Sequence, residues 1–127
     1  MDRESRQRFW VAVVDDDESV RESLPDLLRE AGYLTQAFAS AEEFLDSRDL
    51  VRFGCLILDI AMPGMSGPEL QQELRRRGQA IPVVFITAAG NKTVRPRLLA
   101  EGAVDCLSKP FSETALLAAI SAAERVA

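Results

Sequence analysis

Short apolar runs alternate with longer amphipathic segments along the whole chain. The five runs lie around residues 9–14, 34–38, 55–58, 81–86 and 103–107. Such short continuous runs are typical of strands that are buried on both faces of a parallel sheet. In the segments between them, apolar residues recur at the three- and four-residue spacing of helices that bury one face. The pattern therefore predicts a strand followed by a helix, repeated five times.

Capping residues indicate where these helices begin and end. Asp17 is placed to cap the first helix, and Gly32 to end it. The other expected caps are Ser40 with Glu43 and Ser66 with Glu69, both in the capping-box pattern, and Ser112 before the last helix.

Strand–helix alternation predicts an α/β fold in which helices cover both faces of a parallel sheet. Five units with short right-handed connections favour a three-layer, doubly wound, flavodoxin-like sheet of order 2-1-3-4-5. The 127 residues are enough for one domain and too few for two. We therefore expect a single domain over residues 1–127.

Composition excludes several classes of function. The net charge of −5 argues against direct nucleic-acid binding, and the basic run Arg75–Arg77 fits the end of a helix. The absence of histidine excludes Ser-His-Asp and Cys-His catalysis.

Cys55 and Cys106 lie in apolar runs, as buried reduced thiols do. No apolar stretch is long enough for a membrane span and no signal peptide is recognisable, so we expect a cytoplasmic protein without a membrane partner.

Polar residues stand at the ends of four of the five expected strands. Asp15 and Asp16 follow the first strand, Asp59 the third, Thr87 the fourth and Lys109 the fifth. Because the carboxyl ends of parallel strands meet at one edge of the sheet, we expect these side chains to converge on one site.

Three neighbouring carboxylates repel each other by roughly 4 kcal/mol per close pair at an effective dielectric constant near 20. Lys109 offsets only part of that repulsion. Either some of the carboxyl groups keep a proton, or a divalent cation lies between them, for which Mg²⁺ is the best match. A cation beside a carboxylate, a hydroxyl and an ammonium group favours phosphoryl transfer, with Asp59 as the nucleophile.

Taken singly, each of these residues has an ordinary interpretation. The run Asp15–Asp17 fits a helix-capping loop, Asp59 a turn, Thr87 a strand residue and Lys109 a surface charge. Their combination at successive strand ends favours a functional site.

Four motifs resemble those of the receiver domains of two-component response regulators. They are VVDDD at 13–17, LDIAMPGMSG at 58–67, FITA at 85–88 and LSKPF at 107–111. The resemblance extends from about residue 9 to residue 126. It implies a signalling switch that is phosphorylated by a sensor histidine kinase, by a phosphotransfer protein or by a small phosphodonor.

The resemblance also implies a role for each site residue. Asp59 would be the phosphoacceptor, and Asp59, Asp16 and the backbone carbonyl of Ala61 would ligate Mg²⁺. Asp15 would bind the ion mainly through water. Thr87 and Lys109 would bind phosphoryl oxygens. The peptide bond between Lys109 and Pro110 would be cis.

The segments SAEEFL at 40–45 and MPGMSG at 62–67 resemble the subgroup whose receivers precede a LuxR-type helix-turn-helix domain. This subgroup resemblance favours a fragment of a longer DNA-binding regulator over a natural single-domain protein. It implies an output domain or an effector protein as a further partner. It also implies a monomer or a dimer that forms on phosphorylation.

Three positions depart from the family pattern. Cys106 stands where the family usually has an aromatic residue that moves on activation, and we expect it to be a buried apolar filler. Ala61 and Ala89 are smaller than the residues that many members have beside the site. Pro96 falls in the expected fourth helix, which therefore should begin late, at residue 94 or 95, or be poorly formed.

Other functions remain as alternatives. The missing aromatic residue at Cys106 fits a receiver-fold binding module that signals without phosphorylation. A haloacid-dehalogenase-type enzyme would need a second aspartate at position 61, which is alanine. A flavodoxin-type FMN carrier would need a phosphate-binding loop after the first strand, where Asp15–Asp17 would repel phosphate.

Overall fold

A computed structural model describes residues 9–88 and 93–126 of the chain. Its five strands form one parallel sheet in the order β2-β1-β3-β4-β5. The strands are β1 (Trp10–Val14), β2 (Leu34–Phe38), β3 (Phe53–Asp59), β4 (Val83–Thr87) and β5 (Asp105–Ser108). The predicted fold class and strand order are confirmed.

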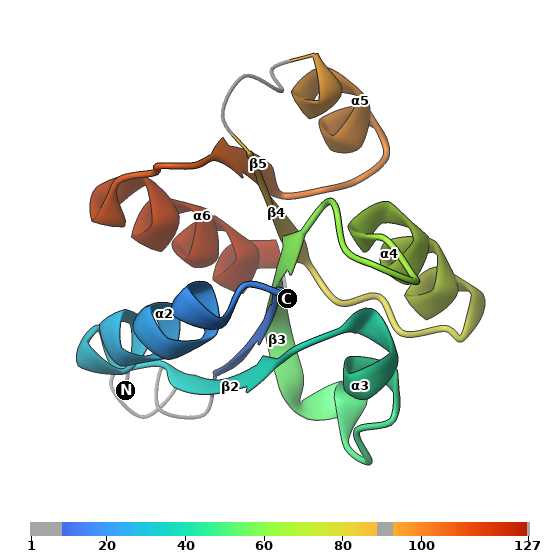
Figure 1. The fold of residues 1–127 in the computed structure, drawn as a ribbon, viewed down its shortest axis with the longest axis horizontal. Coiled ribbons are helices and arrows are strands. Elements are labelled where there is room, and N and C mark those ends of the chain that lie inside the picture. Colours follow the sequence, from blue (N-terminus) through green and yellow to red (C-terminus); the bar gives the residue numbers. More distant parts are fainter. Residues whose placement is uncertain (1–8, 89–92, 127) are drawn as a thin grey trace.

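Helices cover both faces of the sheet (Figure 1). One face carries α2 (Glu18–Glu30) and α6 (Glu113–Val126). The other carries α3 (Ala41–Leu45), α4 (Gly67–Arg76) and α5 (Val94–Ala100), and the short 3₁₀ helix η1 (Leu50–Arg52) leads from α3 into β3. Among the described residues, no helix combines the length and apolar character needed to cross a bilayer.

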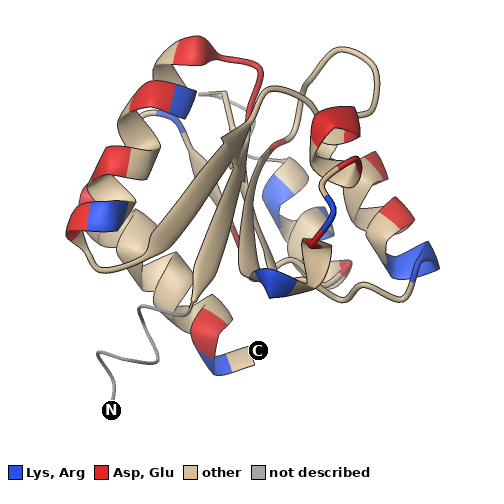
Figure 2. Ribbon diagram, turned by 90° about the horizontal axis from the view of Figure 1, so that it is seen from below, with Lys and Arg blue, Asp and Glu red and all other residues tan. Residues whose placement is uncertain are grey.

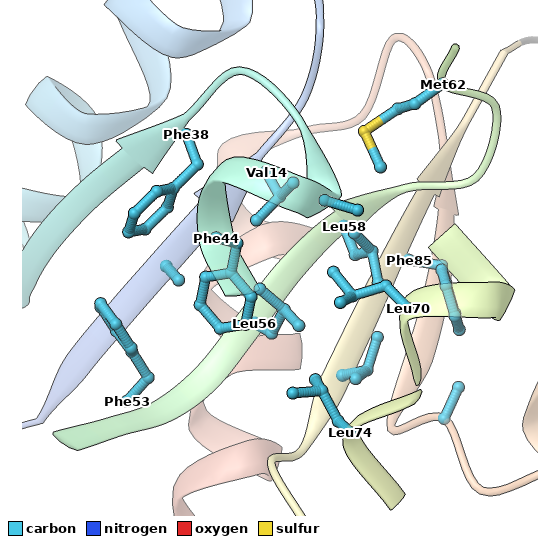
Figure 3. Packing of buried hydrophobic residues seen from close by; sticks show 14 of the residues in the cluster. Val14, Phe38, Phe44, Phe53, Leu56, Leu58, Met62, Leu70, Leu74 and Phe85 are labelled. Atoms are coloured by element: carbon cyan, nitrogen blue, oxygen red, sulfur yellow. The ribbon is translucent and has the colours of Figure 1, made fainter. Parts of the chain in front are cut away.

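Two hydrophobic cores, one on each face, hold the layers together. Successive residues of β1 alternate between them, because strand side chains point to opposite faces. Val11 and Val13 pack with α2 and α6, whereas Ala12 and Val14 pack with α3, α4 and α5. Figure 3 shows the second core, in which the rings of Phe38, Phe44 and Phe53 lie together.

The predicted caps are observed, with one correction. The carboxylate of Asp17 accepts from the N–H of Ser19 at 3.0 Å, and the Ser66–Glu69 capping box is complete. At Ser40 only half of the box forms. The hydroxyl of Ser40 accepts from the N–H of Glu43, but the carboxylate of Glu43 accepts from the N–H of Ala39.

The expected starts of the last two strands were two residues early. β4 begins at Val83 because Pro82 has no N–H to donate to the sheet. β5 begins at Asp105 because the N–H of Ala103 is bonded to the carbonyl of Leu98, at the end of α5.

Helix α5 begins at Val94, as predicted. Pro96 is its third residue, where a backbone N–H would have no partner within the helix. Proline therefore costs no helical hydrogen bond here. The side chain of Arg95 joins α5 to β5 by donating to the carbonyl of Cys106 at 3.2 Å and to the carboxylate of Asp105 at 2.9 Å.

Charged residues lie mainly on the helices and connecting loops, and the strands are largely free of them (Figure 2). Arg76 and Arg77 both pair with Glu73, at 2.5 and 2.7 Å, and Arg75 donates to the carbonyl of Glu101. The basic run is therefore the end of α4, as its position in the sequence predicted.

Candidate functional site

The ends of β1 and β3 bring three carboxyl groups together. The register pairs Val14 with Leu58, so that Asp15 and Asp59 follow at the same level of the sheet. One oxygen each from Asp15, Asp16 and Asp59 lie within 4.8 Å of one another. The convergence that the strand ends predicted is confirmed for these three residues.

Asp15 is the most buried member of this acidic cluster, with no exposed surface. Its carboxylate accepts from the N–H of Asp17 at 2.9 Å and lies 3.3 Å from the ammonium of Lys109. Sequence reasoning missed a second cation nearby. The guanidinium of Arg21 donates to the carbonyl of Asp15 at 3.2 Å, and its place in the first turn of α2, just after the acidic run, was the available signal.

Lys109 reaches the cluster from the segment that follows β5. Its N–H donates to the carbonyl of Thr87 at 2.8 Å, which ties this segment to the end of β4. The peptide bond between Lys109 and Pro110 is cis, as the family resemblance implied. The Lys109 side chain is 31% exposed, so its ammonium borders both the cluster and solvent.

Asp59 lies at the end of β3 and is 8% exposed. Its pKa is raised from the usual 3.8 to about 7. Burial is the largest cause, and the charges of Asp15 and, less strongly, Asp16 add to it. Lys109 and a hydrogen bond from the backbone of Ala61 act in the opposite direction. The central carboxyl group is therefore only partly ionised near neutral pH when no cation is bound.

Thr87 ends the strand beside Asp59. Ile86 is the register partner of Asp59, and Thr87 is the next residue of β4. Thr87 is buried, so its position beside the acidic cluster is fixed by the sheet. Ala89, the other small residue that was expected to flank the site, lies outside the described residues.

The donor set fits a hard divalent cation. All the ligand atoms that the cluster offers are carboxylate oxygens, which Mg²⁺ prefers to nitrogen or sulfur. Burial first, and then the charges of Asp15 and Asp16, disfavour the ionised form of Asp59, and a bound dication would favour it. The three acids therefore fit an Mg²⁺ ion by number, chemistry and charge.

Cys106 is buried among apolar residues, as expected. Burial raises the pKa of its thiol, and burial likewise raises the pKa of Cys55 to about 12. Both thiols are free. Because the thiolate is the reactive form, neither cysteine is suited to nucleophilic chemistry at neutral pH.

Comparison with known proteins agrees with this arrangement. The profile of the response regulator receiver domain matches residues 11–121. The chain is 41% identical over 92% of its length to response regulator protein TodT of Pseudomonas putida, and 44% identical over 94% to nodulation protein W of Bradyrhizobium diazoefficiens. It spans about half the length of these curated relatives, 52% and 53% respectively.

A solved structure gives the same result for the fold. The structure of response regulator StyR superposes on this chain with a TM-score of 0.86 at 48% sequence identity. The match covers 94% of this chain and 60% of the StyR chain. The profile match covers most of the chain. The chain therefore belongs to the response regulator receiver domain family, the signalling domains of two-component systems.

Proposed function

We propose that this domain is a phosphorylation-dependent switch that accepts a phosphoryl group on Asp59 with the help of Mg²⁺. The observation that supports it is the convergence of Asp15, Asp16 and Asp59 beside the ammonium of Lys109. A site selected for stability alone would not bring three acids around one cation.

In the proposed reaction, a carboxylate oxygen of Asp59 attacks the phosphorus atom of the donor. A phosphorus–oxygen bond to Asp59 forms, the bond from phosphorus to the donor breaks, and the product is an acyl phosphate. Lys109 and the hydroxyl of Thr87 bind phosphoryl oxygens and offset their charge. Asp16, Asp59 and the carbonyl of Ala61 would hold Mg²⁺, with Asp15 acting through water, and the ion would supply positive charge that favours the ionised form of Asp59.

The same groups would assist transfer of the phosphoryl group to water, in which the bond between phosphorus and Asp59 breaks, inorganic phosphate is released and Asp59 becomes a carboxylate again. Asp59 is consumed and regenerated by the chain's own chemistry, so the domain acts as a regulator and not as an enzyme on a separate substrate. Positioning and electrostatics account for most of the rate in such transfers.

In this proposal the phosphodonor is a phosphohistidine of a sensor kinase or of a phosphotransfer protein. Residues 1–127 act together as one cytoplasmic receiver domain. Several relatives of about twice the length are named transcriptional regulatory proteins, FixJ of Azorhizobium caulinodans among them. That size difference supports an output domain or effector protein as the second partner. An output domain of the LuxR type, which the resemblance of residues 40–45 and 62–67 suggests, would carry the nucleic-acid binding. The domain itself is a monomer or a dimer linked to phosphorylation.

The test is the intact mass of the protein after incubation with Mg²⁺ and acetyl phosphate. The wild type should gain one phosphoryl group, and Asp59→Asn should gain none. Asp26→Asn, which removes an exposed acid on α2, should react as the wild type does. A folded wild type that gains no mass would overturn the proposal and favour a binding module that works without phosphorylation.

A further inference from the structure

The two segments that resemble the DNA-binding subgroup, residues 40–45 and 62–67, contact each other in the structure. A carboxylate oxygen (Oε2) of Glu42, in the first turn of α3, accepts a hydrogen bond from the backbone N–H of Met65 at 3.0 Å. The same oxygen lies 2.8 Å from the place that a Cβ on Gly64 would occupy. Gly64 has a φ of +74°, so its conformation and this close approach both favour glycine.

Met65 and Gly64 belong to the β3–α4 loop, residues 60–66, which begins directly after Asp59. The base of the loop is closed by a hydrogen bond of 3.0 Å from the N–H of Gly67 to the carbonyl of Ile60. Met62 anchors the middle of the loop in the hydrophobic core (Figure 3). The base of the loop is thus held by its own backbone, and its middle by the hydrophobic core.

The tip of the loop depends on Glu42. The backbone N–H of Met65 donates to Glu42 on α3, whereas the backbone of Ala61, nearer the base of the loop, donates to the carboxylate of Asp59. Ser40 fixes the first turn of α3 by accepting from the N–H of Glu43 at 3.0 Å, so the Glu42 side chain starts from a defined backbone. Hydrogen bonds to an ionised acceptor are the stronger kind, which suits a contact at the surface.

We propose that Glu42 is a positioning residue for the phosphorylation site. It holds the tip of the β3–α4 loop and thereby keeps the backbone of Ala61 against the carboxylate of Asp59. This inference rests on the proposed function, in which the carbonyl of Ala61 is a ligand of the cation. Glu42 itself contacts neither the acidic cluster nor a phosphoryl group.

Three variants test the inference. Glu42→Ala removes the contact, Glu42→Gln keeps a neutral acceptor of the same size, and Glu43→Ala removes an equal charge from the next residue without touching the loop. Amide hydrogen exchange should be faster at Met65 in Glu42→Ala. Mg²⁺ affinity by calorimetry should fall about fivefold in that variant, as expected from the loss of one exposed hydrogen bond.

The rate of labelling by acetyl phosphate at subsaturating Mg²⁺ should fall by the same factor. Glu42→Gln should recover most of both losses, and Glu43→Ala should match the wild type, with all three variants melting as cooperatively as the parent. A purely structural role would lower the melting temperature without changing Mg²⁺ affinity.

The outcomes separate this inference from the proposed function. A wild type that binds no Mg²⁺ and takes no label would overturn both. If the wild type is labelled and Glu42→Ala equals it in Mg²⁺ affinity and rate, only the positioning role is wrong. Equal losses in Glu42→Ala and Glu43→Ala would assign the effect to net charge and would also overturn the inference.

Discussion

Charged side chains have opposite surroundings at the two ends of the sheet. At the carboxyl ends of the strands, three carboxyl groups lie together, and the ammonium of Lys109 lies 3.3 Å from one of them, that of Asp15. At the amino ends, the guanidinium of Arg52 lies 4.4 Å from the ring centre of Trp10 and 5.0 Å from that of Phe53, and it also donates to Gln36. One end crowds charges of the same sign, and the other surrounds a single charge with favourable partners.

The difference indicates which end contributes stability and which provides function. Arg52 adds cation–π attraction to the rings of Trp10 and Phe53. In the acidic cluster, burial and then the charges of Asp15 and Asp16 raise the pKa of Asp59 to about 7. The favourable contacts at the amino ends of the strands therefore offset part of the destabilisation that the acidic cluster causes. The following predictions test this division, from the largest expected effect to the smallest.

Phe53→Ala should cause the largest loss of stability. Phe53 is 3% exposed and contacts the rings of Trp10, Phe38 and Phe44, so truncation leaves a cavity. The free energy of unfolding should fall by about 3–5 kcal/mol, measured by urea denaturation. At a temperature where the variant is folded, its Mg²⁺ affinity should equal that of the wild type. A stable variant with lost Mg²⁺ binding would contradict the division between the two ends.

Asp59 should make the metal-free protein less stable as the pH rises. Between about pH 4 and pH 7 the folded state keeps a proton on Asp59 that the unfolded state has lost, so the free energy of unfolding falls across this range and is level above it. Asp15, Asp16 and Lys109 face this carboxyl group. Because solvent screens the open side of the cluster, the loss in the free energy of unfolding should be roughly 2 kcal/mol.

The measurement is urea unfolding in EDTA at pH 4.5 and 7.5, for the wild type and for Asp59→Asn. The difference between the two proteins isolates Asp59 from the other acids. Asp59→Asn should be the more stable protein at pH 7.5. An Asn variant that is clearly less stable there would show that the cluster is not strained.

Mg²⁺ should restore part of the stability that the cluster costs. At ten times the dissociation constant, binding to the folded state alone adds about 1.4 kcal/mol, seen as a rise in the melting temperature. NaCl at equal ionic strength is the control for general screening. Asp59→Asn should show a smaller rise, and an unchanged wild-type melting temperature at saturating Mg²⁺ would refute the metal site.

Arg52→Ala should have the smallest effect. Loss of the cation–π contacts with Trp10 and Phe53 should lower the free energy of unfolding by about 0.5–1 kcal/mol. Arg48→Ala removes the same charge four residues earlier and is the matched control. Equal effects in the two variants would mean that charge alone, and not stacking, accounts for the loss.

Periodicity and capping residues predicted most of the fold because they are local signals. The acidic cluster was also predictable, since parallel strands necessarily bring their carboxyl ends to one edge. The late starts of β4 and β5 were not predicted, because they depend on which backbone groups Pro82 and Ala103 leave available. The side-chain contacts of Glu42 with Met65 and of Arg52 with Trp10 join distant segments, and no spacing in the sequence indicates them.

Gly67 determines how a change in the backbone of Asp59 would reach the rest of the molecule. A Cβ at this position would lie 2.4 Å from the carbonyl oxygen of Asp59 and 3.1 Å from the ring of Phe85. The first turn of α4 therefore lies against the backbone of Asp59, the proposed nucleophile, with no side chain between them. If the Asp59 carbonyl shifts by a few tenths of an ångström, we expect α4 to move with it as a rigid body. The position of α4 would then report the backbone geometry at the end of β3.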